Sequence, residues 1–177
     1  NNWQENIIKS IKRTSNLNLG VIGAGRIGSS VLLKAKALNF KTFFYDPYKE
    51  YGYEKTLNSK RFDDLDNLLK KCNIISIHTP LTTETLGLVN KNFIKKLKKN
   101  CIFVNTARGE IVENLDYLYD GLISKKLSFV ALDVLPEETL PINNSKLINA
   151  WKNNDKISCK IIINPHTSYY SKEAFFE

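Results

Sequence analysis

Short apolar runs alternate with stretches of helical periodicity along this chain. The first run ends at Val21 and Ile22, and residues 27–38 follow with apolar side chains at helical spacing. A second apolar run closes on Asp46. The apolar face of the predicted helix consists of Ile27, Val31, Leu32, Ala35 and Leu38. This order predicts a strand, a helix and a second strand.

The same alternation continues toward the end of the chain. Further strands are predicted at 74–77, 101–104, 127–132 and 160–163. Helices are predicted from the apolar groups Leu65, Leu68 and Leu69, then Phe93, Ile94 and Leu97, then Leu115, Leu118, Leu122 and Ile123. Asp63 or Asp64 is the expected N-cap of the first of these helices, and Asn90 that of the second. Such alternation indicates an α/β fold with a doubly wound parallel sheet.

Two further regions have a less regular pattern. Residues 3–11 carry apolar side chains at helical spacing, so we expect a lead-in helix that packs on the edge of the sheet. Residues 136–156 are predicted to form a long polar loop with one helical turn around Leu147, Ile148 and Trp151.

A glycine-rich turn joins the first predicted strand to the first predicted helix. Gly23 allows the tight turn, Gly25 leaves bare backbone for a pyrophosphate, and Gly28 lets the helix pack closely on the sheet. Asp46 follows at the tip of the next strand, where an acid binds ribose hydroxyls and repels a 2'-phosphate. The pattern predicts a Rossmann dinucleotide-binding fold that prefers NAD to NADP. Arg26 either assists the pyrophosphate or is a solvated helix residue.

The alternative is a tight turn in an α/β domain that binds no nucleotide. That alternative accounts for the three glycines but leaves the acid at the tip of the second strand without a role.

Composition narrows the class of protein. The chain has 177 residues with 42% hydrophobic content, which is enough for one domain with a full core. No apolar run is long enough to cross a bilayer, and the first residues lack the layout of a signal peptide. We therefore expect a cytoplasmic protein with no membrane partner.

Charge and cysteine usage give two more expectations. The net charge is +8, but the lysines stand in scattered pairs at predicted helix ends, so nucleic-acid binding is not expected. Cys72, Cys101 and Cys159 are odd in number and lack CxxC spacing, and we expect them to be reduced and buried.

Polar residues gather where the later predicted strands end. Ligands of such sheets bind outside the carboxyl ends of the strands. The residues at or just after those ends are His78, Arg108, Asp133, Glu138 and His166. Together they predict a site at this edge of the sheet, and no metal-ligand set is predicted there.

The same segments carry a family resemblance. The motifs are GAGRIG at 23–28, YDPY at 45–48, HTPLTTET at 78–85, VNTARG at 104–109, ALDV at 131–134, PH at 165–166 and SKEA at 171–174. In this order they resemble the D-isomer-specific 2-hydroxyacid dehydrogenases over essentially the whole chain. Within that family the chain is most similar to the branch of C-terminal-binding-protein-like and phosphoglycerate-dehydrogenase-like members.

The resemblance implies roles for three catalytic residues. Arg108 would bind the substrate carboxylate with two parallel bonds and polarise the carbonyl. His166 would exchange a proton with the hydroxyl or carbonyl oxygen. Glu138 would orient this histidine, with Glu137 as the rival if the loop is shifted by one residue. Thr139 follows Glu138 where the family usually has proline, and this departure loosens the Glu138 assignment.

The resemblance also implies NAD as the cofactor. Asp133 would hold the nicotinamide carboxamide, Thr106 and Arg108 would lie near the nicotinamide ribose, and residues 78–80 would line the middle of the cofactor. His78 is given no catalytic role, since a histidine that closes a buried strand is more often a packing residue. The predicted cofactor-binding set is Gly23, Gly25, Arg26, Ile27, Gly28, Asp46, His78, Thr79, Pro80, Thr106, Ala107, Arg108, Asp133 and His166.

The implied function is the interconversion of a 2-keto acid and a D-2-hydroxy acid. The alternatives are an NAD(H)-responsive binding module like the corepressors of this branch, and an enzyme that acts on phosphoglycerate. Tyr169 stands where corepressor-like members carry tryptophan, so the sequence does not decide which substrate is used. We also expect residues 1–177 to be the excised cofactor domain of a larger two-domain enzyme that forms a homodimer.

Overall fold

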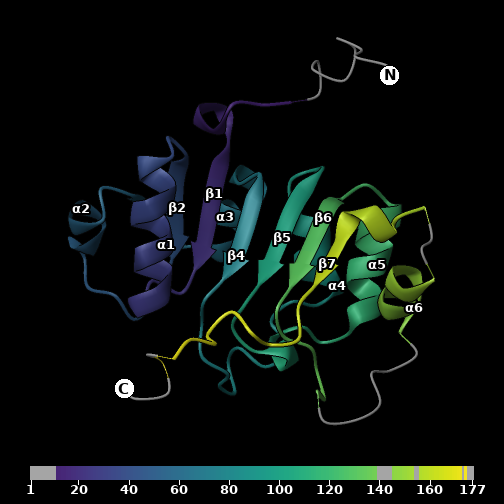
Figure 1. Ribbon diagram of the computed structural model, residues 1–177. Helices are drawn as coiled ribbons and strands as arrows, with labels where there is room; N and C mark the ends of the chain where they lie inside the picture. Colours follow the sequence, from purple (N-terminus) through teal and green to yellow (C-terminus); the bar gives the residue numbers. More distant parts are fainter. Residues whose placement is uncertain (1–10, 139–144, 154–155, 173, 175–177) are drawn as a thin grey trace.

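The fold is built on one sheet of seven parallel strands in the order β3-β2-β1-β4-β5-β6-β7 (Figure 1). The computed structural model describes residues 11–138, 145–153, 156–172 and 174. The strands are β1 (Asn18–Ile22), β2 (Lys41–Tyr45), β3 (Lys60–Arg61), β4 (Ile74–Ile77), β5 (Cys101–Asn105), β6 (Leu127–Leu132) and β7 (Ile161–Ile163). The predicted doubly wound parallel sheet is confirmed.

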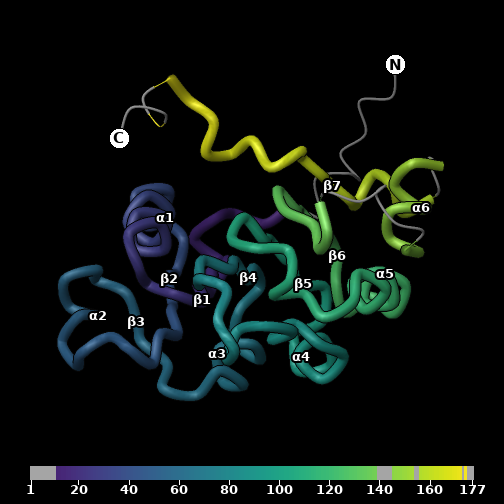
Figure 2. Tube along the Cα trace, turned by 90° about the horizontal axis from the view of Figure 1, so that it is seen from below, coloured from purple at the N-terminus to yellow at the C-terminus, as the bar shows by residue number. Residues whose placement is uncertain are grey.

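Helices cover both faces of the sheet. They are α1 (Arg26–Ala37), α2 (Tyr53–Thr56), α3 (Leu65–Lys71), α4 (Lys91–Lys96), α5 (Leu115–Ile123) and α6 (Lys146–Lys152). Short 3₁₀ turns lie at Thr14–Asn16, Gly109–Ile111 and Ser158–Lys160. α1 packs on β1 and β2, whereas α3, α4 and α5 join a second hydrophobic cluster on the opposite face (Figure 2).

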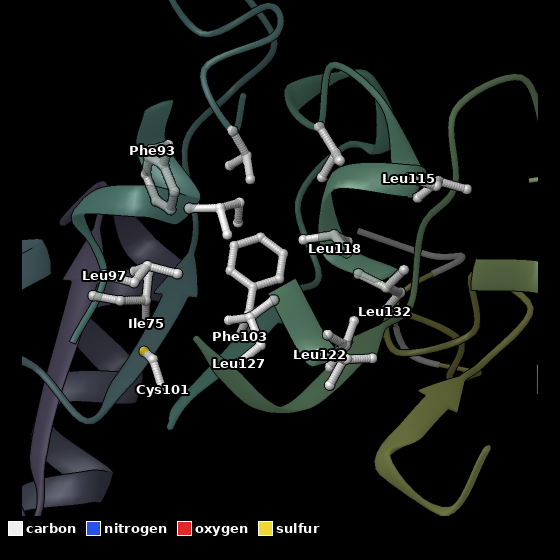
Figure 3. Close-up of a cluster of buried hydrophobic side chains, with 14 of the residues drawn as sticks. Ile75, Phe93, Leu97, Cys101, Phe103, Leu115, Leu118, Leu122, Leu127 and Leu132 are labelled. Carbon is white, nitrogen blue, oxygen red and sulfur yellow. The ribbon is translucent and has the colours of Figure 1, made fainter. Parts of the chain in front are cut away.

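That second cluster is the larger core of the domain (Figure 3). Phe103 on β5 is fully buried, and its ring meets the ring of Phe93 edge-on at 6.4 Å between centroids. Leucines of α5 pack beside it from one face. The smaller cluster lies between α1 and β1–β2 and includes Val21, Leu32 and Phe44. Strands buried on both faces explain the near-continuous apolar runs of the sequence.

Side-chain caps start four of the helices. Asp64 accepts a hydrogen bond from Asn67 N at 3.0 Å, so the first predicted cap is Asp64 and not Asp63. Asn90 caps α4 as predicted, and Asn114 caps α5 in the same way. Ser145 caps α6, which is a helix of two turns where the sequence predicts one. Each cap satisfies a backbone N–H that the helix leaves without a partner.

Some predicted positions differ from the structure. Ile27 and Leu38 are 66% and 64% exposed, because they lie at the two ends of α1, beyond the stretch that faces the sheet. The buried positions of α1 are Gly28, Leu32 and Ala35. Cys159 is exposed in the 3₁₀ turn before β7, so its predicted burial is wrong, whereas Cys72 and Cys101 are buried as predicted. Burial raises the pKa of both buried thiols to about 12.

Two regions of the prediction lie outside the described residues. Most of the expected lead-in helix falls on residues 1–10, and Thr139 falls in the gap at 139–144. In the part of the chain that the structure describes, no helix has the length and hydropathy needed to cross a bilayer. The lysine pairs at 70–71 and 95–96 lie in the last turns of α3 and α4, as the sequence predicts.

Candidate functional site

The glycine turn between β1 and α1 excludes side chains at two positions. Gly23 has φ of +89°, and a Cβ there would stand 2.8 Å from the carbonyl of His78. A Cβ on Gly28 would stand 1.9 Å from the carbonyl oxygen of Gly23. Both contacts are with backbone, which cannot move aside without disturbing β4 or the turn itself. Glycine is therefore required for the helix to start this close to the sheet.

Gly25 is different, because a Cβ there would meet nothing within 4 Å. It is the N-cap residue of α1, and no side chain caps the helix at this end. The first N–H groups of α1 and the positive end of its dipole therefore face open space above bare backbone. This is the arrangement that a pyrophosphate needs. Arg26 and Ile27 are exposed in the same first turn.

Asp46 is held at the end of β2 by the glycine turn. It is 9% exposed, its Oδ2 accepts a hydrogen bond from Ala24 N at 2.8 Å, and its Oδ1 accepts one from Tyr48 N at 3.0 Å. Each carboxylate oxygen keeps a second lone pair, and Asp46 lines the neighbouring cavity. The carboxylate is therefore fixed in place and can still accept bonds from a ligand.

A cavity of about 330 Å³ lies at the carboxyl ends of β1, β2 and β4. It stands at the point where the strand order reverses, since β1 pairs with β2 on one side and β4 on the other (Figure 2). Its lining includes Gly23, Gly25, Asp46, Tyr48, His78, Thr79, Pro80 and Glu84. The hydroxyl of Thr79 is buried without a hydrogen-bond partner among the described residues. A ligand with polar groups would satisfy it.

His78 closes β4 beside this cavity. Its Nε2 lies 2.8 Å from Ser76 Oγ, and burial lowers its pKa to about 4. A histidine that stays neutral and bonded within its own strand is suited to packing, in line with the absence of a predicted catalytic role.

A second group of polar side chains lies further along the same edge, after β6 and β7. His166 Nδ1 lies 2.8 Å from Glu138 Oε2, and Glu138 Oε1 accepts a hydrogen bond from Leu135 N at 3.0 Å. The two side chains are 34% and 38% exposed, so they are open to solvent on one side. Asp133, Glu138 and His166 line one cavity of about 220 Å³. The contact falls on Glu138 and not on its predicted rival, Glu137.

Arg108 lies on the loop after β5, at the same edge of the sheet. The loop is fixed by Asn105, a fully buried side chain whose Oδ1 accepts from Ala107 N at 3.0 Å and whose Nδ2 donates to Arg108 O at 2.9 Å. Gly109 brings the loop against the next one, since a Cβ there would stand 2.1 Å from Leu135 C. The exposed guanidinium of Arg108 donates to Ala107 O at 2.7 Å.

The predicted cofactor residues therefore divide into two places. Residues 23, 25, 46 and 78–80 line the cavity at β1, β2 and β4, and residues 106–108, 133 and 166 lie at the carboxyl ends of β5, β6 and β7. Three residues of the site have no role in the sequence prediction. Asn105 fixes the Arg108 loop, while the hydroxyl of Tyr48 donates to Glu84 beside the cavity. For Asn105 the sequence does carry a signal, because a polar asparagine directly follows an apolar run. The contact between Tyr48 and Glu84 joins two loops and has no such signal in the sequence.

Comparison with known proteins identifies the family of this chain. Residues 1–168 match the family model described as the D-isomer specific 2-hydroxyacid dehydrogenase, NAD binding domain. The hydroxypyruvate reductase of Blautia hydrogenotrophica is 38% identical over 157 residues, which are 89% of this chain and 45% of that protein. The glyoxylate reductase of Thermofilum pendens is 37% identical over 126 residues, which are 71% of this chain and 37% of that protein.

Solved structures of D-2-hydroxyacid dehydrogenases also match this chain. The D-lactate dehydrogenase of Aquifex aeolicus, complexed with NAD and lactic acid, matches with a TM-score of 0.77 and 31% identity over 93% of this chain and 50% of that one. The D-mandelate dehydrogenase of Rhodotorula graminis matches with a TM-score of 0.82 and 28% identity over 97% and 47% of the two chains. The chain spans less than half the length of the two reductases described above. It belongs to the NAD-binding domain family of the D-isomer specific 2-hydroxyacid dehydrogenases.

Proposed function

We propose that this chain is the cofactor domain of an enzyme that interconverts a 2-keto acid and a D-2-hydroxy acid. The observation that carries the proposal is the 2.8 Å contact between His166 and Glu138, at the sheet edge that also holds the glycine turn. The names of the relatives, which include hydroxypyruvate reductase, glyoxylate reductase and D-lactate dehydrogenase, support this substrate class.

NAD fits the groups at the first half of the edge. Gly25 and the start of α1 would hold the pyrophosphate with Arg26 beside them, and Asp46 would accept hydrogen bonds from the adenine ribose. Thr79 would bond the cofactor with its buried hydroxyl. Residues 106–108 and Asp133 would lie toward the nicotinamide. When bound, NAD supplies or accepts the hydride.

His166 is the proposed proton donor and acceptor. Glu138 occupies Nδ1 of its ring, so Nε2 is the nitrogen left to face the substrate oxygen. In reduction, the imidazolium gives its Nε2 proton to the oxygen of the carbonyl; in oxidation, the neutral ring takes the hydroxyl proton. The Glu138 carboxylate stabilises the charged ring and fixes its tautomer when it is neutral.

Arg108 is the proposed anchor for the substrate carboxylate. Its guanidinium is exposed and bonds only a carbonyl of its own loop among the described residues, a neutral partner that a carboxylate would replace. Two parallel charge-assisted bonds would fix the plane of the carboxylate and draw electron density from the neighbouring carbonyl.

The test is NADH oxidation by the complete gene product that contains this chain. A panel of 2-keto acids is assayed, a phosphorylated acid included, and at least one acid is expected to be reduced to the D-hydroxy product. Arg108→Ala is expected to raise KM and lower kcat. Tight NADH binding without oxidation on any acid would instead favour the NAD(H)-responsive binding module.

The proposal also covers the domain content, the oligomeric state and the location of the protein. The active protein would contain a second domain, since the chain spans only 37% and 45% of two relatives. It would be a homodimer, because exposed apolar side chains of β6 and β7 share one face of the sheet. It would reside in the cytoplasm, where thiols such as the three free cysteines stay reduced.

A further inference from the structure

The segment after β7 carries His166 on an irregular loop. Its residues from Pro165 to Tyr170 have no regular structure, and all except His166 are largely exposed. Within the loop, Tyr170 N donates to Thr167 O at 3.0 Å. Figure 1 shows that the chain leaves β7 here and runs back along the carboxyl edge of the sheet. A histidine on such a loop needs an external anchor if its ring is to have one position.

Asp133 supplies that anchor from the end of β6. Its side chain is 4% exposed, and its Oδ1 accepts a hydrogen bond from Thr167 N at 3.1 Å. Ser168 N donates to both carboxylate oxygens, at 3.3 Å and 3.1 Å. Two consecutive backbone N–H groups thus converge on one buried carboxylate, an arrangement that bonds an anion strongly.

The conformation of His166 makes this convergence possible. His166 has φ of +52°, in the left-handed region that residues with a Cβ seldom adopt. This turn lies immediately before the two N–H groups that reach Asp133. A backbone held in an unfavourable conformation needs surrounding contacts to keep it there, and the carboxylate provides them.

Two carboxylates of one loop therefore hold the same histidine. Asp133 fixes the backbone that follows it, and Glu138 fixes the ring through Nδ1. We infer that Asp133 is a positioning residue for His166, which sets the place of the imidazole through the N–H groups of Thr167 and Ser168. The catalytic meaning of this anchor rests on the proposed function, but the anchor itself exists without cofactor or substrate.

The first test uses Asp133→Asn in the cofactor-free chain. The amide would offer one acceptor oxygen in place of two and turn its NH₂ group toward the N–H donors. Hydrogen exchange of the Thr167 and Ser168 amides, followed by NMR, is expected to be slower than at exposed Tyr169 in the wild type and at least about tenfold faster in the variant. Asp120→Asn, which changes an exposed carboxylate on α5, is the matched control and should leave both amides unchanged.

The ring of His166 gives a second readout in the same samples. The chain has two histidines, so His78 serves as an internal reference. The variant is expected to shift the ring signals of His166 and to leave those of His78 in place. Rapid exchange at Thr167 and Ser168 in the wild type, or unchanged exchange and ring signals in the variant, would overturn the inference.

The catalytic readout separates this inference from the proposed function. In the complete gene product, Asp133→Asn is expected to lower kcat about a hundredfold, and the Kd of NADH is expected to rise by a smaller factor, because Asp133 would also lie toward the nicotinamide. A large rise in that Kd with kcat retained would overturn the positioning role in favour of a cofactor contact. If the wild type reduces no 2-keto acid, the proposed function fails, and the exchange experiment still decides whether Asp133 anchors the loop.

Discussion

His78 and His166 are the two histidines of the chain, and burial gives them different properties. His78 lies beside Ser76 at the end of a buried strand, whereas the ring of His166 is 34% exposed and pairs with Glu138. The sequence indicates this division, since one histidine closes an apolar run and the other follows a proline after the last strand.

The buried ring of His78 is expected to make the stability of the domain depend on pH. Burial lowers its folded pKa to about 4 from an ordinary value of 6.5, so below pH 6.5 the unfolded chain binds the extra proton. The stability that the neutral ring contributes is complete above pH 6.5 and is lost as the pH falls toward 4. The loss is about 2 kcal/mol, because the ring keeps some contact with solvent.

The measurement is urea unfolding of the wild type and His78→Asn between pH 4.5 and 7.5. As the pH falls, the free energy of unfolding of the wild type is expected to decrease more than that of the variant. The other titrating groups are common to both proteins, so the difference reports on His78. A difference that stays constant across this range would contradict the prediction.

The sequence predicts which residues have useful chemical groups more accurately than it predicts which residues those groups contact. It assigned Glu138 as the partner of the histidine but kept Glu137 as a rival, because neighbouring acids in a loop look alike until the backbone direction is known. In the structure Glu137 has φ of +58°, and Glu138 is the one that meets His166. It gave no role to Asn105, whose bonds to Ala107 and Arg108 depend on how the loop folds back.

At the scale of an element, the turn before α1 contains two glycines with different tasks. Gly28→Ala places a Cβ 1.9 Å from the carbonyl of Gly23, so the helix must move and the domain is expected to lose about 1–3 kcal/mol. Gly25→Ala meets nothing within 4 Å, so stability is expected to stay near the wild type. Its methyl group would instead occupy the space proposed for the pyrophosphate.

The two variants serve as controls for each other. Urea unfolding measures stability, and calorimetry measures NADH binding. We expect Gly25→Ala to fold normally and bind NADH at least about tenfold more weakly. A Gly25→Ala variant with wild-type affinity, or a Gly28→Ala variant with unchanged stability, would show that the turn does not work in this way.

Strong local signals predicted the elements, and weak ones were missed. Strands β4 and β6 match their predicted limits because apolar runs bounded by polar residues define them. α2 has four residues and no periodic pattern, so the sequence does not predict it. It is held in place by its own first residue, Tyr53, whose ring meets Phe44 edge-on and whose hydroxyl lies 2.8 Å from Ser29 Oγ.

At the scale of the whole molecule, one face of the sheet is only partly covered. Phe129 on β6 and Ile162 on β7 are 46% and 57% exposed, and Ala131, two residues after Phe129, pairs with Ile162. They lie on the same face as Ile74 and α1, since Ile74 pairs with Ile102 and Ile102 with Phe129. Exposed apolar side chains in one place favour contact with another protein surface.

The proposed homodimer predicts that this face is buried in solution. Light scattering on the complete gene product is expected to give twice the mass of one chain, and Phe129→Ser with Ile162→Ser is expected to shift it toward the monomer. Ile123→Ser, at a residue of α5 on the opposite face that is 56% exposed, is the control and should remain dimeric. A monomeric wild type, or a double variant that stays dimeric, would contradict this use of the face.

The strand order was partly open to prediction. Alternating strands and helices imply a parallel sheet with right-handed crossovers, and the glycine turn marks β1 as the strand beside the reversal. The place of β7 at the far edge of the sheet, beside β6, does not follow from its short apolar run. The catalytic candidates follow from the same rule, because the carboxyl ends of parallel strands meet at one edge.

The proposed function requires His166, held by Glu138, to move the substrate proton, and paired glutamate variants test this requirement most directly. In the complete gene product, kcat for NADH-dependent reduction of a 2-keto acid is measured for the wild type, Glu138→Gln and Glu137→Gln. We predict a loss of about 10²-fold or more in Glu138→Gln and less than about threefold in Glu137→Gln, because Glu138 is the acid whose carboxylate lies 2.8 Å from the imidazole. Equal losses in the two variants, or no reduction by the wild type, would contradict the claim.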